Sequence, residues 1–360
     1  MHAPAGASSV HLVVRVTGNF TSESPLDPAA RQALLAAFDQ GWADPKKLSQ
    51  SSAKAAILRN QAIENIASRL KVRADSIEIL GEPAMGHFLG IAGLLSPSAT
   101  LHYSAIDKGK IRAIARMHPG PTIEIPVGHN GDIQIEHPIE KGHVLSLQLA
   151  NSETGVIQSY EKLSTGNGLI AVDATASGAR LSLPSHWDTA LFDSTAWNGP
   201  AGVAILAINN PAEYSYPLPH IAPIRTPGSS SLPLLIASSL ALENFRVEDE
   251  SLRMYAVEKV ANIPGVEVVA PSAKALPHIF SCLVHGVAGE YLVRELSRLG
   301  IDIDSGSACN PEDLQPSHVL ASMGYGTEGH LRFTLHPGTT REDLDLLVHS
   351  ISTVTSALSR

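Results

Sequence analysis

The chain contains 360 residues, of which 26 are lysine or arginine and 35 are aspartate or glutamate, so its formal net charge is −9. This acidic balance argues against a nucleic-acid-binding protein, because it offers no basic face to a phosphate backbone. The two cysteines are too few for a disulfide scaffold or a multi-cysteine metal site, and they are typical of a reducing compartment.

Apolar runs in the sequence are too short for a membrane span, which needs roughly 20 residues. The longest, 169–172 and 203–208, have the length of strands. The first nine residues lack the cationic flank and apolar segment of a signal peptide. We therefore expect a soluble, cytoplasmic protein without a membrane partner.

The chain begins with two predicted helices. Asp27 followed by Pro28 predicts an N-cap and a proline at the first helical position, and an apolar stripe follows at Leu34, Leu35 and Phe38. A second helix is predicted over 52–70, because apolar residues recur there at three-, four- and five-residue spacings, namely Ile57, Leu58, Ile63, Ile66 and Leu70.

The middle of the chain alternates short apolar runs with helical or loop segments. Most runs are continuous, as expected for strands that are buried on both faces. This alternation predicts an α/β sheet with crossover connections. The predicted strands are 77–80, 100–106, 122–125, 144–150, 169–173, 190–193 and 203–208.

The pattern changes near residue 230. One long helix is predicted over 233–263, and a smaller α+β unit follows it. We place a large domain at 20–235 and a small C-terminal domain at 236–360, with residues 1–19 packing on the small domain. The expected elements of the small domain are strands at 266–269, 279–284 and 331–335, a helix at 289–299 and a last helix that opens with the near capping box Thr340–Asp343.

Several motifs in fixed order carry a family resemblance. The most specific is SGSACNPEDLQPSHVL at 305–320, and the others gain weight from their order and spacing: VLSLQLANSETGVIQ at 144–158, VDATA at 172–176, FDSTAWNGPAG at 192–202 and LRFTLHPGTT at 331–340. Together they resemble the cysteine desulfurases, within the class V aminotransferases of the pyridoxal phosphate (PLP) fold type I group. The resemblance extends from about residue 19 to residue 351.

The resemblance implies a large domain with a mostly parallel seven-stranded sheet, a small α+β domain and a homodimer whose subunits share their active sites. It also implies the transfer of sulfur from L-cysteine to an acceptor protein. That chemistry uses a lysine that forms a Schiff base with PLP, an aspartate that keeps the pyridine nitrogen protonated, and a mobile cysteine that receives the sulfur.

Four residues match functional positions of the family, and each has a plainer alternative. Asp173 matches the pyridine-binding aspartate, or it caps a loop at the end of a strand. Cys309 matches the sulfur-accepting cysteine, or it is an ordinary thiol in an inherited loop. Arg332 matches the arginine that holds the substrate carboxylate, or it makes a structural ion pair. Ser229 matches a hydroxyl that reaches the PLP phosphate of the neighbouring subunit, or it is a turn serine. The second cysteine, Cys282, is predicted to be a core residue.

The lysine that the resemblance requires is absent. The family pattern Ser-x-His-Lys precedes Gly-Pro by three residues, and here Gly199-Pro200 places Asp193-Ser194-Thr195-Ala196 in that register. Ser194 keeps a potential cofactor hydroxyl, but Ala196 stands at the lysine position. Among the ten lysines of the chain, the nearest in sequence is Lys162.

Other cofactor contacts differ as well. Gly81-Glu82-Pro83-Ala84 replaces the phosphate loop Gly-x-Thr-Glu, which brings a negative charge and removes an N–H donor. Lys108 stands where a histidine stacks on the ring, Ser152 where an amide contacts the ring hydroxyl, and Ala176 where a glutamine follows the aspartate. His129, His137 and His143 have no metal-ligand spacing, so no metal site is expected.

The sequence therefore predicts a cysteine desulfurase homologue that has lost PLP Schiff-base chemistry. Its expected role is that of a non-catalytic partner, in a homodimer or in a mixed dimer with an active relative, or of a sulfur relay through Cys309. The alternative is an active PLP-dependent desulfurase or lyase with an atypical site. Lys108 is then the candidate for a relocated Schiff base, and its plainer interpretation is a solvated or ion-paired lysine.

Overall fold

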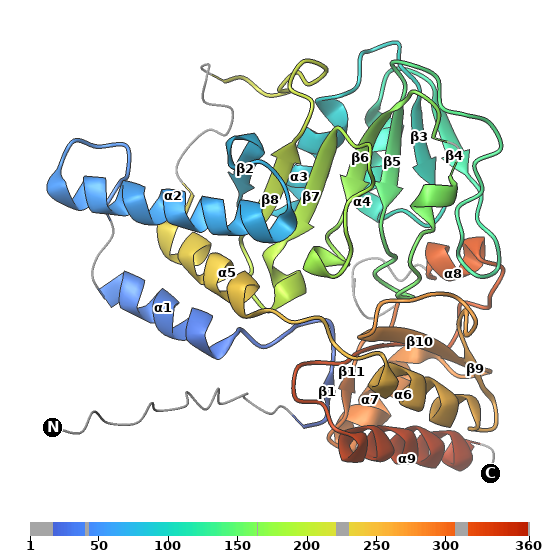
Figure 1. Ribbon diagram of the computed structural model, residues 1–360. Coiled ribbons are helices and arrows are strands. Elements are labelled where there is room, and N and C mark those ends of the chain that lie inside the picture. The colour runs from blue at the N-terminus through green and yellow to red at the C-terminus, as the bar shows by residue number, and fades with distance from the viewer. Residues whose placement is uncertain (1–16, 40–42, 164, 221–229, 307–315, 359–360) are drawn as a thin grey trace, which may run out of the picture.

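The computed structural model describes residues 17–39, 43–163, 165–220, 230–306 and 316–358. A seven-stranded sheet forms its centre, in the order β2-β8-β7-β6-β5-β3-β4 (Figure 1). Strands β4, β3, β5, β6 and β7 run parallel, whereas β8 is antiparallel to both β7 and β2. The strands are β2 (Ile77–Leu80), β3 (Leu101–Ser104), β4 (Thr122–Ile125), β5 (Val144–Gln148), β6 (Leu169–Asp173), β7 (Thr189–Asp193) and β8 (Ala204–Ile208).

Helices cover both faces of this sheet, so the large unit has three layers. On one face, α1 (Pro28–Asp39), α2 (Gln50–Leu70) and α5 (Leu232–Asn244) lie together, and α2 and α5 pack a core against Val172 and Phe192 (Figure 1). On the other face, α3 (Pro83–Ala92) and α4 (Gly109–Met117) pack against Leu101 and Leu206. The predicted α/β class and mostly parallel seven-stranded sheet are confirmed.

A second core lies in the C-terminal part of the chain. Helices α6, α7 and α9 contribute to this core together with the antiparallel sheet β12-β10-β9 (Figure 1). The short strand β1 (Asn19–Phe20) pairs in parallel with β11 (Asp302–Ile303), which joins the start of the chain to this unit. The remaining elements are α6 (Ser251–Ala261), β9 (Val266–Val268), β10 (Ile279–Val284), α7 (Gly289–Arg298), α8 (His318–Ser322), β12 (His330–Thr334) and α9 (Arg341–Leu358).

The helix predicted over 233–263 is in fact two helices, α5 and α6, separated by Phe245–Glu250. Helix α5 packs in the first core and α6 in the second. The division into a large and a small domain remains a proposal, and this packing favours a boundary after α5 rather than at residue 235.

Local signals at helix ends act as the sequence predicts. The Asp27 carboxylate accepts from the backbone N–H of Ala30 at 2.8 Å, and α1 begins at Pro28. Thr340 and Asp343 cap α9 reciprocally, with distances of 2.9 Å and 3.3 Å from backbone nitrogen to side-chain oxygen. The apolar stripes are only partly buried, because Leu35, Phe38, Ile57 and Leu58 are exposed.

Short 3₁₀ helices complete the fold: η1 (Ala74–Ser76), η2 (Tyr160–Lys162), η3 (Gly178–Arg180) and η4 (Ser194–Trp197). Two of them follow the carboxyl ends of the central strands β6 and β7. Because ligands of open α/β sheets bind outside the carboxyl ends of parallel strands, these turns mark the place to look for a site.

Candidate functional site

A cavity of about 830 Å³ lies where the carboxyl ends of the central strands face the C-terminal unit. Its walls come from the starts of α3 and α4, the turns after β6 and β7, and the strands β10 and β12. Residues singled out in the sequence line it, namely Glu82, Pro83, Lys108, Ser152, Ala176, Ala196 and Arg332. The structure thus brings together residues from both units of the chain.

Asp173 ends strand β6 and is buried behind this cavity. One carboxylate oxygen accepts from the Thr175 backbone N–H at 2.9 Å and from the Thr175 hydroxyl at 2.5 Å. The other oxygen lies 3.1 Å from Nε2 of His87 and 3.4 Å from Nζ of Lys108. Burial alone would raise the pKa of Asp173, but Lys108, His87 and Thr175 outweigh it and hold that pKa below its usual value.

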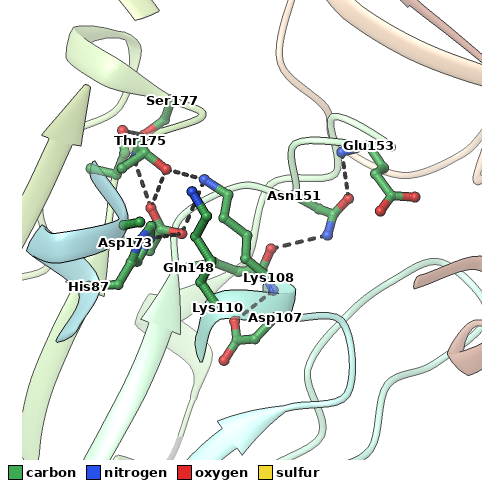
Figure 2. Close-up of polar contacts among 12 residues, drawn as sticks. His87, Asp107, Lys108, Lys110, Gln148, Asn151, Glu153, Asp173, Thr175 and Ser177 are labelled. Atoms are coloured by element: carbon green, nitrogen blue, oxygen red, sulfur yellow. Dashed lines mark hydrogen bonds and ion pairs between the residues drawn. The ribbon is translucent and has the colours of Figure 1, made fainter. Parts of the chain in front are cut away.

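Lys108 precedes α4 and extends its side chain to the end of β6 (Figure 2). Its ammonium group donates to the Thr175 hydroxyl and pairs with the Asp173 carboxylate. Only 29% of the Lys108 side chain is exposed. Of the two interpretations that the sequence left open, the structure shows the ion-paired lysine.

A second buried carboxylate, Asp107, stands next to Lys108 in the chain. It accepts from the Ser104 backbone N–H at 2.9 Å and from the Gln148 amide at 3.0 Å. Burial raises the pKa of Asp107 to about 7, although the Ser104 hydrogen bond opposes the shift. Nε2 of His318 lies 2.8 Å from the Asp107 carbonyl oxygen, so the segment that carries Lys108 is held from two sides.

Glu82, in the segment that replaces the phosphate loop, caps helix α3. Its carboxylate accepts from the Ala84 backbone N–H at 3.0 Å and lies 3.4 Å from Nζ of Lys110. Pro83 follows at the first helical position and has no N–H to donate. The positive end of the helix dipole is therefore already occupied by a carboxylate of the chain.

The turn after β7 carries Ser194 and Ala196, two of the four residues that stand in the register of the Schiff-base motif. Ala196 lines the cavity with a methyl group, and its carbonyl oxygen accepts from Arg180. Ser194 is buried, and its hydroxyl donates to Ser238 of α5 at 2.8 Å. The expected cofactor contact of Ser194 is therefore replaced here by a contact within the core.

Arg332 of β12 lines the cavity and forms an ion pair with Asp304. Its Nε atom is buried and has no hydrogen-bond partner among the described residues. The structural ion pair that the sequence left as an alternative is thus present, and one guanidinium N–H remains unused.

Sequence reasoning missed several residues of this cavity, above all His87, Arg180 and His278. Arg180 pairs through two nitrogens with Glu248, at 2.8 Å for Nε. Burial keeps the pKa of His278 well below its usual value, with Arg180 acting in the same direction. A usable signal for Arg180 was its place directly after the VDATA strand end, in a segment with few other charges.

Two predicted site residues, Ser229 and Cys309, lie outside the described residues. The other cysteine, Cys282, is buried in the second core, as predicted. Burial raises the pKa of the Cys282 thiol to about 12, so it is unreactive near neutral pH.

Neither a metal site nor a membrane span is found in the described parts of the chain. They contain no group of three or more histidine, cysteine, aspartate or glutamate residues that could hold a metal ion. None of the described helices combines the length and apolar character needed to cross a membrane.

Comparison with known proteins finds a matching family model and similar sequences. The aminotransferase class V family model matches residues 228–347. The putative cysteine desulfurase NifS of Bacillus subtilis (strain 168) is 25% identical over 86% of this chain and 87% of its own. The cysteine desulfurase IscS 1 of Archaeoglobus fulgidus is 25% identical over 94% and 97%, respectively.

A solved NifS-like protein supports the same assignment at the level of the fold. It superimposes with a TM-score of 0.83 at 21% identity, covering 95% of this chain and all of its own. The family model, the sequence matches and the order of the motifs support the cysteine desulfurase family of the class V aminotransferases.

Proposed function

We propose that this chain is a non-catalytic member of the cysteine desulfurase family, one that has lost PLP Schiff-base chemistry and serves as a partner protein. One observation carries the proposal. The carboxylate of Asp173, which in active relatives would face the cofactor ring, is already paired with the chain's own Lys108 at 3.4 Å, and Ala196 stands at the lysine position.

The described residues do not fit PLP. A phosphate dianion at the start of α3 would meet the Glu82 carboxylate, and Pro83 offers no N–H to bind it. The hydroxyl of Ser194 is engaged with Ser238 in the core. A pyridine nitrogen would have to displace the Lys108 ammonium from Asp173. We therefore assign no reaction step to the cofactor in this chain.

The proposed role follows from the retained fold. We expect a cytoplasmic protein that forms a homodimer, or a mixed dimer with an active relative, and that contacts a sulfur-acceptor protein without binding nucleic acid or membrane. Family membership supports this role, because the relatives found are cysteine desulfurases.

Absorbance spectroscopy tests the loss of Schiff-base chemistry. Purified full-length protein mixed with PLP is expected to show no band near the visible edge beyond that of the free cofactor, because no lysine is available at position 196. Reduction with borohydride followed by peptide mass spectrometry should find no pyridoxyl adduct. An active desulfurase of the family, treated in parallel, serves as the positive control.

An adduct at Lys108 would overturn the proposal in favour of the alternative, an active PLP-dependent desulfurase or lyase with a relocated lysine. The geometry argues against that alternative. A Schiff base needs a free amine, and the Lys108 nitrogen is bound to a carboxylate and a hydroxyl. The Lys108→Ala protein is the matched control for the trapping experiment.

A sulfur relay through Cys309 is the second version of the proposed role, supported by the retained SGSAC motif. In this version Cys309 receives persulfide sulfur from an active desulfurase. We expect Cys309→Ser to lose most of the radiolabelled sulfur that the parent accepts, and Cys282→Ser to keep it, because Cys282 is buried with a raised thiol pKa. Equal labelling of the parent and Cys309→Ser would rule the relay out.

A further inference from the structure

The buried carboxylate of Asp173 needs a positive partner. Only 5% of the residue is exposed, and a buried carboxylate without compensation is costly. The hydrogen bonds from Thr175 satisfy one of its oxygens. The other oxygen faces His87 and Lys108. In a PLP-dependent relative, the protonated ring nitrogen would supply this positive charge.

Lys108 supplies that charge from within the chain. Its ammonium donates to the Thr175 hydroxyl, which donates in turn to Asp173, and it also pairs directly with the second carboxylate oxygen (Figure 2). The proton donors thus form a short chain that ends on the acid. The neighbouring Asp107 is held by Ser104 and Gln148, which fixes the point from which the Lys108 side chain starts.

At the start of α3, Glu82 supplies a negative charge in the same way. The N-terminus of a helix attracts anions, and here the Glu82 carboxylate accepts the available Ala84 N–H. Lys110 of α4 lies 3.4 Å from the same carboxylate. The positive charge at the start of α3 is therefore neutralised by the chain itself, without a ligand.

Most of the positive charges that line the cavity are also paired with negative ones. Of the five lysine and arginine residues that line the cavity in the described part of the chain, four pair with a carboxylate within 4 Å. The fifth, Arg116, and the carboxylate of Asp193 add one charge of each sign without an ion pair among the described residues. His278 adds none, because burial holds its pKa well below the usual value. The four pairs are Lys108 with Asp173, Lys110 with Glu82, Arg180 with Glu248 and Arg332 with Asp304.

We propose that Lys108 is a resident cation that replaces the protonated cofactor ring at Asp173, while Glu82 replaces the phosphate at α3, so that the chain fills the charged positions of its own cavity. The inference rests on the proposed function, because it presumes that no PLP is bound. It adds that the side chains of Lys108 and Glu82 supply the charges that stabilise the site in place of a cofactor. It also predicts that removal of Lys108 opens a binding site for a small primary ammonium ion.

Thermal unfolding of three full-length variants tests the proposal. Lys108→Ala should lower the melting temperature by about 5 °C, because it removes the lysine partner of a buried carboxylate. Lys108→Ala/Asp173→Asn should recover at least half of that loss, since the acid and its partner are removed together. Lys110→Ala, the matched control on the exposed start of α4, should melt close to the parent.

Chemical rescue gives the second readout. Propylammonium chloride should raise the melting temperature of Lys108→Ala by several degrees and leave the parent and the double variant unchanged. Sodium chloride at the same ionic strength and propan-1-ol are the controls, because they supply only salt or only the alkyl chain. If Lys108→Ala does not fold, recovery of folding in the double variant supports the proposal.

Two outcomes would overturn it. One is a Lys108→Ala protein that melts with the parent, and the other is a double variant no better than the single one. These outcomes are separate from the failure of the proposed function, which would be a Schiff-base band and a lysine adduct in the parent protein. Either result can occur without the other.

Discussion

Replacing Arg180 by leucine is expected to lower the free energy of unfolding by about 3–5 kcal/mol, the range typical for removing one partner of a buried ion pair. Only 4% of the Arg180 side chain and 18% of the Glu248 side chain are exposed. The guanidinium also donates to the carbonyl oxygen of Ala196 and lies 4.7 Å from the centre of the Phe245 ring. Among the described residues, its loss leaves Glu248 without a cation and the Ala196 carbonyl without a donor.

The position of Arg180 explains why its replacement is expected to destabilise the protein strongly. The residue ends the turn η3 after β6, Ala196 belongs to the turn η4 after β7, and Glu248 lies between α5 and α6. One side chain thus ties two strand ends of the large sheet to the segment that connects the two cores.

Denaturant unfolding at neutral pH measures the effect. We expect the midpoint to fall without a change in slope, because the folded structure should stay equally compact. Arg73→Leu is the matched control, since Arg73 pairs with Asp75 on the surface and should leave the midpoint nearly unchanged. Arg180→Leu/Glu248→Leu should be less destabilised than Arg180→Leu alone. An Arg180→Leu midpoint equal to that of the parent would contradict the assignment.

Much of the fold could be predicted because its strands are continuous apolar runs. The predicted ranges 77–80, 122–125 and 169–173 match β2, β4 and β6 residue for residue. These strands alternate with segments that must cross back over the sheet, so the mostly parallel order follows from chain geometry. The division between α5 and α6 could not be seen, because Phe245–Glu250 contains neither glycine nor proline to mark a break.

Helix α3 was missed for a different reason. The family resemblance drew attention to 81–84 as a replaced phosphate loop, and that interpretation hid the start of a helix. Proline at the first helical position was a usable signal, as it was at Pro28. Glutamate, however, is not among the residues that usually cap a helix, so the cap at Glu82 could not be ranked from the sequence.

The resemblance located the candidate site better than it located the contacts. It placed Asp173 and Lys108 near one another, but the ion pair between them spans 65 positions and depends on the side-chain conformation of Lys108. His87, Arg180 and His278 carry no motif, and only the packing of both units brings them to the cavity. Contacts of this kind arise from tertiary structure, which local sequence patterns do not record.

Protonation of His330 is expected to cost the protein about 3 kcal/mol of stability as the pH is lowered from about 6.5 to about 4, whereas the raised pKa of Asp107 acts in the opposite direction. His330 begins β12 and is 2% exposed, and neither ring nitrogen has a hydrogen-bond partner among the described residues. Burial lowers its pKa to about 4, with Glu153 opposing the shift and Arg332 supporting it.

The sign follows from the two states of the ring. In the folded protein His330 stays neutral down to about pH 4, whereas in the unfolded chain it binds a proton near pH 6.5. Between these values the ring binds more protons in the unfolded state, so acid favours unfolding through His330. Above about pH 6.5 both states are neutral, and the contribution of His330 to stability is complete.

Denaturant unfolding of His330→Gln at pH 7.5 and pH 4.5 isolates this contribution. The variant loses a buried ring and is expected to be less stable at both values, but the destabilisation that His330 causes in the parent between them, about 2–3 kcal/mol, should be absent from the variant. His137→Gln, at an exposed position, should lose as much as the parent. If His330→Gln and the parent lose equal stability on acidification, the ring is not held neutral by burial in the folded state.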